Sequence, residues 1–464
     1  MVLVRKSVNT WLKMGRKNVD INKKMTYNKC NGGESMQRFL MDELVKWKEK
    51  PNRKPMILKG ARQVGKTWLM KEFGKTYFKK TAYVSFYNNQ RMKKVFDNDY
   101  NIDRIIMNIN IEAQTEVTPY DTLIIFDEIQ EAPRALESLK YFCEDAPEYP
   151  IIVAGSLLGV ALHSGISFPV GKVDTLNLYP MNFREFLLAM GESGLAELLV
   201  GGNHTFISDF REKYIFWLKN YYYVGGMPGI VNFFAEHKDY SEVRKLQIDI
   251  IQQYEDDFGK HTPANELPRI KMVWNSIPLQ LAKENKKFFF GKIREGARAK
   301  EFEIAIEWLL DCGLITKVYK INKPAMPVKA YMDFSSFKLY LLDVGLLGAL
   351  SELDAVSILE GNSIFTEFKG ALTEQYVLQQ LVTDTEYKPY YYASEKSTHE
   401  VDFIIQKGKD VVPIEVKAEE NLKAQSLKAY CEKFKPAYAV RTSMSNYREQ
   451  EWMTNIPLWM ISKI

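Results

Sequence analysis

The sequence predicts an α/β chain built on a doubly wound parallel sheet with helices on both faces. Three observations predict this class. An apolar run at 56–58 precedes a glycine-containing loop at 60–67, a second apolar run at 122–126 ends in two acids, and a third lies at 150–155. Continuous apolar runs of this length are typical of parallel strands buried on both faces. Ligands of such sheets bind beyond the carboxyl ends of the strands, so we expect the functional residues there.

The loop at 60–67 matches the phosphate-loop pattern G-x-x-x-x-G-K-S/T at every fixed position. Glycines let successive backbone N–H groups turn toward phosphates, and the following helix presents its positive dipole end to them. A plain strand-to-helix turn is the alternative, but it does not require these four residues. The sequence therefore predicts an ATP site made by Gly60, Ala61, Arg62, Gln63, Val64, Gly65, Lys66 and Thr67, with Lys66 on the terminal phosphates and Thr67 on Mg²⁺.

The two acids that end the run at 122–126 support the same site. Asp127 is placed to hold Mg²⁺, and Glu128 is placed to orient or deprotonate the water that attacks the γ-phosphate. Taken alone, an apolar run followed by two acids also fits a solvated strand end. Together with the phosphate loop, it predicts ATP hydrolysis.

Three further positions resemble parts of AAA-type and related ATPases. Ser156 follows the run at 150–155 and resembles the residue that senses the γ-phosphate, although a serine in a tight turn is the alternative. Pro228, in Gly226-Met227-Pro228, resembles the Gly-x-Pro at which a helical lid approaches the nucleotide, and a plain helix-helix turn is the alternative. Lys172 could meet the nucleotide of a neighbouring subunit, but a single lysine is usually a surface residue.

Length and composition indicate a multidomain globular protein. The 464 residues predict about three domains, and 46% hydrophobic with 26% charged residues excludes a disordered chain. The apolar stretch at 151–162 is shorter than the roughly 20 residues that span a bilayer, so we expect no membrane partner. The four cysteines lack C-x-x-C spacing, which predicts a reducing cytoplasm and argues against zinc.

The pattern of elements predicts five parts. Residues 1–35 read as a mobile basic tail or an over-extended start, and 36–190 alternate strands and helices. The order is a basic N-terminal tail at 1–35, a P-loop ATPase domain at 36–190, a helical lid at 191–270, a winged helix at 271–355 and an α/β domain at 356–464. The winged helix is expected from a helix at 300–311, strands at 314–319 and near 329–332, and a helix near 338–350.

A basic stretch precedes the expected winged helix. Residues 283–300 hold seven Lys or Arg and two Glu, an excess that equals the net charge of +5 of the whole chain. Phosphate binding is the natural use of such a stretch, which makes DNA a probable partner, with the aromatic side chains of 288–290 either packed in the core or available for stacking. A solvated charged surface or a protein contact is the alternative.

The C-terminal part holds a second set of candidate catalytic residues. Asp402 lies in an expected strand at 400–405, and Glu415 and Lys417 share one face of a strand at 413–418 because their spacing is two. Asp402 and Glu415 can hold Mg²⁺, Lys417 can position or deprotonate the attacking water, and Glu374 can act as an outer ligand. This set resembles the restriction-endonuclease-like fold, with Val401 in place of the usual proline. A half-buried strand with alternating residues is the alternative.

These segments together resemble one family, the prokaryotic AAA-type P-loop ATPases with a C-terminal domain of unknown function, which are related to archaeal ATPases. The likeness is carried by residues 60–67, 127–130, 180–186, 226–228, 338–343 and 415–417. It implies ATP binding with hydrolysis, and a C-terminal half that is nuclease-like or associated with DNA. The predicted function is therefore an ATPase that couples Mg-ATP to DNA engagement, with DNA cleavage left open. The alternative is a non-cleaving nucleotide switch whose C-terminal region binds a protein partner.

Overall fold

The computed structural model describes residues 36–155, 168–262, 265–283, 286–359, 366–394, 399–419 and 424–464. The predicted basic tail at 1–35 and Ser156 lie outside these residues. The described residues belong to a single unit, 36–464. Within them, no helix combines the length and the apolar character needed to cross a bilayer.

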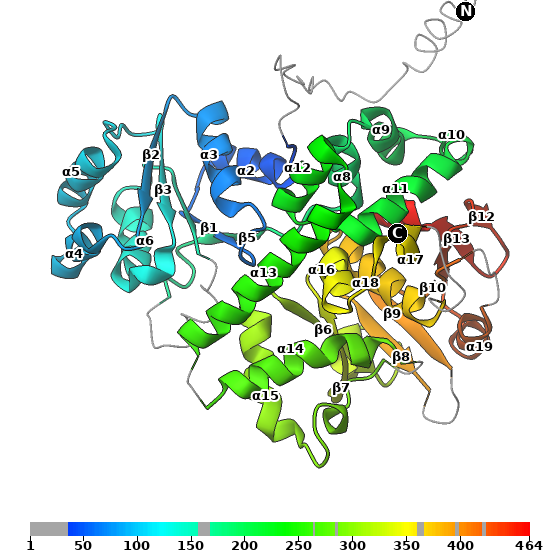
Figure 1. Cartoon of the computed structure of the whole chain (residues 1–464). Helices are drawn as coiled ribbons and strands as arrows, with labels where there is room; N and C mark the ends of the chain where they lie inside the picture. The colour runs from blue at the N-terminus through cyan, green and yellow to red at the C-terminus, as the bar shows by residue number, and fades with distance from the viewer. Residues whose placement is uncertain are drawn as a thin grey trace, which may run out of the picture. The chain divides into compact units, whose positions relative to one another are not determined.

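A parallel sheet of five strands forms the N-terminal part, as predicted (Figure 1). Its order is β2 (Lys80–Ser85), β3 (Thr122–Asp127), β4 (Ile151–Ala154), β1 (Met56–Lys59) and β5 (Asp174–Asn177), and every neighbouring pair is parallel. The phosphate loop leaves the end of β1, and the two acids end β3. Both therefore lie at the carboxyl edge of one sheet, where such folds bind ligands.

Alternating side chains of these strands enter two separate cores. Leu123 and Ile125 pack on one face with α2 (Leu40–Glu49) and α3 (Lys66–Tyr77). Ile124 and Phe126 pack on the other face with α4 (Gln90–Asn98), α5 (Ile102–Ala113) and α6 (Pro133–Asp145) (Figure 1). Burial on both faces explains why the strands read as continuous apolar runs in the sequence.

Helices dominate the next part of the chain. They are α8 (Phe183–Ala189), α9 (Ser193–Gly201), α10 (His204–Asp209), α11 (Arg211–Val224), α12 (Pro228–His237), α13 (Tyr240–His261) and α14 (Leu267–Leu281). Asn182 and Glu185 form a reciprocal capping box at the start of α8, which satisfies two backbone N–H groups there. Pro228 is the first residue of α12, as expected for a residue without a backbone N–H.

A second sheet of eight strands crosses the boundary predicted between the winged helix and the C-terminal domain. Strand β6 (Ile315–Ile321) pairs with β7 (Met332–Leu341) on one side and with β8 (Tyr390–Ala393) on the other. The edge of β6 is thereby covered, which avoids a row of unpaired backbone groups. The full order is β12 (Arg448–Glu449), β13 (Thr454–Pro457), β11 (Val440–Ser443), β10 (Asp410–Val416), β9 (Glu400–Lys407), β8, β6 and β7.

One expected helix is shorter than predicted. Residues 338–341, expected to begin a helix, are the end of β7, and the helix α16 begins only at Val344. Asp343 caps α16 by accepting a hydrogen bond from the N–H of Leu346 at 3.1 Å, which fixes the start of the helix. The remaining elements are α15 (Ala299–Asp311), α16 (Val344–Leu350), α17 (Ala355–Leu359), α18 (Thr366–Asp384), α19 (Gln425–Phe434) and the 3-10 helices Ile129–Glu131, Phe290–Lys292, Val328–Tyr331 and Leu458–Lys463.

Candidate functional site

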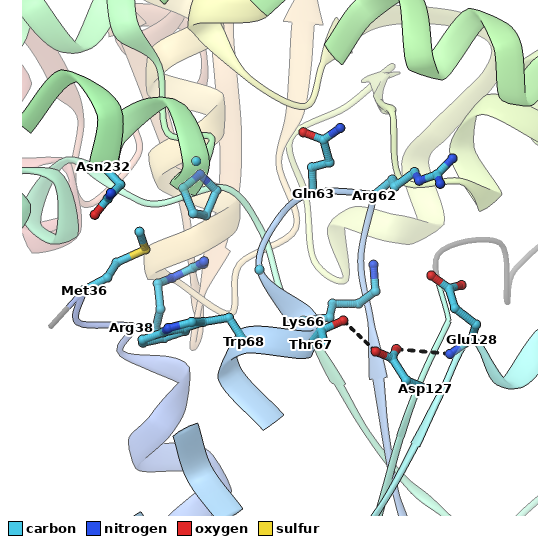
Figure 2. Close-up of a pocket in the computed structure, with 13 residues that line it drawn as sticks. Met36, Arg38, Arg62, Gln63, Lys66, Thr67, Trp68, Asp127, Glu128 and Asn232 are labelled. Carbon is cyan, nitrogen blue, oxygen red and sulfur yellow. Dashed lines mark hydrogen bonds between the residues drawn. The ribbon is translucent and has the colours of Figure 1, made fainter. Parts of the chain in front are cut away.

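The phosphate loop has the backbone shape that its glycines permit. Gly60 and Gly65 have φ angles of 150° and 94°, in a region that disfavours other residues. A Cβ atom on Gly60 would lie 2.3 Å from the backbone oxygen of Leu178, so a side chain there would clash. Lys66 is the first residue of α3, and the N-terminus of this helix therefore opens at the loop (Figure 2).

Lys66 is a buried cation at the N-terminus of α3. Its Nζ donates hydrogen bonds to the backbone oxygens of Gly60 at 2.9 Å and Ala61 at 2.7 Å. Burial lowers the pKa of Lys66 to about 8, although the negative charges of Glu128 and Asp127 oppose this shift. An anionic ligand beside this ammonium group would compensate the cost of its burial, which fits a phosphate site.

Thr67 and Asp127 meet as the motifs predict. The Oγ1 of Thr67 donates a hydrogen bond to Oδ2 of Asp127 at 2.7 Å (Figure 2). The hydroxyl of Tyr83 on β2 donates to the same oxygen at 3.0 Å. Burial, and then the charge of Asp127, raise the pKa of Tyr83 well above its ordinary value. The hydroxyl and the carboxylate lie together, so this pair fits the hard oxygen ligands that Mg²⁺ prefers.

Glu128 is held by Gln130, the last residue of the run at 127–130, for which the sequence predicted no role of its own. The Nε2 of Gln130 donates to Oε2 of Glu128 at 2.6 Å, and Glu128 itself has a φ angle of 52°. Gln130 lies against Gly155 at the end of β4, where a Cβ atom would be 2.2 Å from Oε1 of Gln130. Close packing therefore fixes the amide that orients the candidate catalytic carboxylate.

Most of the predicted nucleotide residues line a pocket of about 550 Å³ (Figure 2), whereas Gly60, Ala61 and Val64 do not line it. The residues that line it are Met36, Arg38, Arg62, Gln63, Gly65, Lys66, Thr67, Trp68, Asp127, Glu128, Pro228, Gly229 and Asn232. Pro228 and Asn232 come from α12, so the Gly-x-Pro segment does reach the pocket. Lys172 forms an ion pair with Glu144 at 2.7 Å and does not line the pocket.

Arg38 braces the phosphate loop and was missed at the sequence level. Its Nη1 donates to the backbone oxygen of Val64 at 2.8 Å, and its Nε donates to Oε1 of Glu185 at 3.2 Å. Arg38 is buried, so both contacts are shielded from water. A lone arginine ahead of the first helix carries no motif, and its acidic partner lies 147 residues away. Only the tertiary structure brings them together.

A family model described as an AAA domain matches residues 52–187. Residues 52–187 are an AAA domain. Models for two domains of unknown function match the rest of the chain, DUF8612 at 215–357 and DUF4143 at 369–461. The chain is thus an AAA-type P-loop protein with additional C-terminal domains, as the resemblance in its sequence implied. No curated protein matches the chain.

Solved structures show distant likeness to the AAA protein. A Walker-type ATPase of Pyrococcus abyssi is 14% identical over 68% of this chain and 96% of its own, with a TM-score of 0.43. An Orc1 protein of Aeropyrum pernix, solved in complex with DNA, is 12% identical over 68% of this chain and 90% of its own, with a TM-score of 0.25. AMPPCP-bound DnaA of Aquifex aeolicus is 12% identical over 60% of this chain and 89% of its own, also with a TM-score of 0.25. At such scores these structures do not define sites in this chain.

C-terminal to the AAA domain in sequence, three predicted residues form a largely buried acidic cluster, which we define as Glu374, Asp402 and Glu415. Glu374 comes from α18, Asp402 from β9 and Glu415 from β10. Oδ2 of Asp402 accepts a hydrogen bond from the N–H of Val416 at 2.7 Å, and Oε1 of Glu415 pairs with Nζ of Lys417 at 2.7 Å. The structure brings these three side chains together.

The pKa values in the acidic cluster reflect burial and its charges. Burial, followed by the charges of Glu374 and Glu415, raises the pKa of Asp402 well above its usual range. Burial also raises the pKa of Glu415, and Lys417 offsets only part of this effect. Burial alone would raise the pKa of Glu374 as well, but ammonium groups beside it lower that pKa to about 2. Among the three acids of the cluster, Glu374 is the one whose pKa is lowered.

The ammonium groups come from outside the DUF4143 match. Nζ of Lys286 forms an ion pair with Oε1 of Glu374. Nζ of Lys338 on β7 forms an ion pair with Glu400 and lies 3.7 Å from Oε2 of Glu374. The hydroxyl of Tyr340 donates to the same Oε2 at 3.1 Å. Both oxygens of Glu374 are thus occupied by protein donors.

The acidic cluster as placed here does not fit a metal ion. Among the described residues, no three His, Cys, Asp or Glu side chains are arranged to hold a metal ion. One atom nevertheless lacks a partner, because Oε2 of Glu415 is buried and accepts no hydrogen bond. The predicted Mg²⁺ ligands Asp402, Glu415 and Glu374 are neighbours, but the lysines on Glu374 occupy the oxygens that a metal would require.

Proposed function

We propose that this protein binds and hydrolyses Mg-ATP. The observation that carries the proposal is the convergence of Lys66, Thr67, Asp127 and Glu128 on one pocket at the carboxyl edge of the AAA sheet. The loop N–H groups and Lys66 bind the phosphates, and Thr67 with Asp127 would hold Mg²⁺, which neutralises phosphate charge when bound. Glu128, oriented by Gln130, positions and deprotonates the attacking water.

Two substitutions separate binding from hydrolysis. Lys66→Ala removes the cation that faces the phosphates, and we expect it to abolish ATP binding in isothermal titration calorimetry. Glu128→Gln keeps the shape of the side chain but removes the base, so ATP still binds and phosphate release slows by about 100-fold or more. Lys75→Ala, an exposed lysine on the same helix α3, is the matched control and should behave as wild type. Unchanged ATP affinity in Lys66→Ala would refute the proposal.

We also propose that the basic stretch at 283–300 engages DNA. Lys292, Arg298 and Lys300 are exposed in it, and Arg294 pairs with Glu301 at 2.6 Å. Phe289 is 42% exposed, with Nζ of Lys283 lying 5.3 Å from its ring centre, whereas the rings of Phe288 and Phe290 pack against Phe337. Exposed cations beside one exposed ring suit a phosphate backbone and a stacked base.

A salt titration tests the DNA proposal. Wild-type protein should bind labelled single-stranded, duplex or branched DNA with an affinity that falls steeply with salt, measured by fluorescence anisotropy. Lys292→Ala/Lys300→Ala should reduce the slope of log K against log salt by about two for duplex DNA, because two phosphate contacts are lost. Lys75→Ala/Lys94→Ala, with two exposed lysines of the AAA domain, should leave the slope unchanged. Absence of DNA binding at low salt would leave the alternative, a nucleotide switch that binds a protein partner.

Beyond DNA binding, we propose that the DUF4143 region cleaves DNA. The unpartnered Oε2 of Glu415 beside Asp402 supports it, because a buried acceptor without a donor is suited to a cation. Mg²⁺-dependent nicking of plasmid DNA, if present, must disappear in Asp402→Ala. Nicking that survives this change would come from another site.

We propose a reducing cytoplasm as the location of the protein. Among the described residues, Cys143, Cys312 and Cys431 are free thiols, which fits a reducing compartment.

A further inference from the structure

The acidic cluster is neutralised by a lysine that belongs to a different domain. Lys286 lies in the segment that follows α14, within the DUF8612 match, whereas Glu374, Asp402 and Glu415 belong to the DUF4143 match. The side chain of Lys286 is 12% exposed, and that of Glu374 is 7% exposed. A buried carboxylate is stabilised by a nearby cation, and the ion pair with Lys286 occupies Oε1 of Glu374.

Lys286 differs from the second lysine at the cluster in how it is held. Lys338 is fully buried in β7, where its backbone is held in register with Val318 of β6 and its ammonium group lies between Glu374 and Glu400. Lys286 lies outside any helix or strand. Its segment is anchored two residues later, where the N–H of Phe288 donates to the backbone oxygen of Phe337 at 2.8 Å. The side chain of Lys286 can therefore leave Glu374 without a change in the sheet.

We propose that Lys286 is an autoinhibitory cation, which occupies Glu374 in the closed arrangement and excludes divalent cations from the acidic cluster. A second observation points to the excluded ligand. Oε2 of Glu415, in a side chain that is 5% exposed, accepts no hydrogen bond, although Arg441 of β11 is paired with Glu415 in register. A cation would satisfy this acceptor once Lys286 leaves Glu374. The proposal rests on the proposed function only for its consequence, which is control of cleavage, because cation binding is measured directly.

The test is Mn²⁺ binding to the nucleotide-free full chain, followed by the electron paramagnetic resonance signal of free Mn²⁺. All proteins carry Asp127→Asn, so that the AAA site does not contribute. The parent protein should bind Mn²⁺ at the cluster at least about tenfold more weakly than the same protein with Lys286→Met, because the methionine removes the competing charge. Lys292→Met changes the same charge at an exposed position of the same segment and should give no gain. Lys286→Arg keeps the cation and should also give no gain.

A third variant shows where the Mn²⁺ binds. Lys286→Met/Glu374→Gln should lose the added affinity, because Glu374 no longer supplies a charged oxygen. This double variant also removes the uncompensated carboxylate, so it should fold even if Lys286→Met does not. Equal Mn²⁺ affinity in the parent and in Lys286→Met would overturn the proposal.

A measurement on wild-type protein needs no folded variant. Competitive acetylation with acetic anhydride, read by mass spectrometry, should modify Lys286 at least about tenfold more slowly than the exposed Lys292, because a buried, ion-paired amine is shielded from the reagent. Equal rates would contradict the closed arrangement. The two hypotheses fail separately. If Lys286→Met gains Mn²⁺ affinity but wild type does not nick DNA, Lys286 keeps its autoinhibitory role and the cleavage hypothesis is wrong. If wild type nicks DNA but Lys286→Met gains no Mn²⁺ affinity, the role of Lys286 is wrong.

Discussion

At the scale of single residues, Lys66 and Glu374 are both buried ionisable groups, one of them cationic and the other anionic. Each is a buried charge, and each needs a partner of opposite sign to remain ionised. Glu374 finds its partners within the chain, in Lys286 and Lys338. Lys66 bonds only backbone oxygens of its own loop, and burial lowers its pKa to about 8. The AAA site therefore favours an anion, whereas Glu374 already has its cations within the chain.

The shifted pKa of Lys66 predicts how ATP affinity depends on pH. The phosphates stabilise the ammonium form, so bound ATP raises the pKa of Lys66. Above pH about 8 the free protein has lost this proton and must take it up on binding, so ATP affinity falls with rising pH, by up to about tenfold per pH unit. Calorimetry at pH 7, 8 and 9, in buffers of different ionisation enthalpy, measures both affinity and proton uptake. A flat affinity without proton uptake at pH 9 would contradict the shift.

The sequence predicted the residues whose chemistry depends on neighbours along the chain. Gly60 to Thr67 form one loop and Asp127 ends one strand, so a motif and a strand pattern were sufficient to place them. Arg38 and Gln130 were missed for different reasons. Arg38 bonds the loop directly at Val64, but Glu185, which holds its guanidinium group, is distant in sequence. Gln130 is only two residues from Glu128, but its role depends on Gly155, which directly follows β4.

At the scale of elements, the second sheet shows what local patterns leave undetermined. Strand β8 has four residues, and it pairs with β6 through Lys320 and Tyr391, which are far apart in sequence. Short strands carry weak periodicity, and nothing in a local pattern selects a partner at such a distance. The sequence therefore predicted β1, β3, β4, β6, β9 and β10 near their observed positions, but it predicted none of β5, β8, β11, β12 and β13, and it did not show that both C-terminal regions share one sheet. The strand expected near 329–332 is mostly a 3-10 helix, because β7 begins only at Met332.

A partly buried acid joins two helices and gives a second pH dependence. Asp384, at the end of α18, accepts a hydrogen bond from Asn182, which caps α8. Burial raises the pKa of Asp384 to about 7, so the folded protein holds a proton there that the unfolded chain releases near pH 4. Its contribution to stability is therefore present at low pH and falls by roughly 3 to 4 kcal/mol as the pH rises from about 4 to 7.

Asp384→Asn should remove this loss. The amide still accepts the hydrogen bond from Asn182 but never ionises, so the variant should melt at a higher temperature than wild type at pH 8. The difference should shrink at pH 5, where Asp384 is protonated in the folded wild type. Asp145→Asn, an exposed aspartate at the end of α6, should leave both melting temperatures unchanged. Thermal denaturation followed by circular dichroism measures the difference, and a variant that melts below wild type at pH 8 would show that the charge is tolerated.

At the scale of the whole molecule, α18 connects the nucleotide pocket with the acidic cluster. The N–H of Gly226, two residues before Pro228 of the pocket, donates to Oδ2 of Asp343 at 2.7 Å. The same oxygen accepts a hydrogen bond from Nε2 of Gln379 on α18 at 3.0 Å. Glu374 lies on this helix, five residues earlier. A movement of the Gly-x-Pro segment on ATP binding would therefore be transmitted to α18 through these buried hydrogen bonds.

Gln379→Ala tests whether this connection carries energy between the sites. In wild type we expect DNA affinity to differ between the ATP-bound and ADP-bound states, by about fivefold or more, as is common for coupled sites. Gln379→Ala should reduce that difference while ATP affinity stays near the wild-type value, because Gln379 does not line the pocket. Gln375→Ala is the matched control, since Gln375 is buried on the same helix but bonds only the backbone of Leu341 on β7. Anisotropy titrations with each nucleotide give the coupling energy. If both variants lose it equally, general loosening of α18 is the cause, and the hydrogen bond to Asp343 is not the specific link.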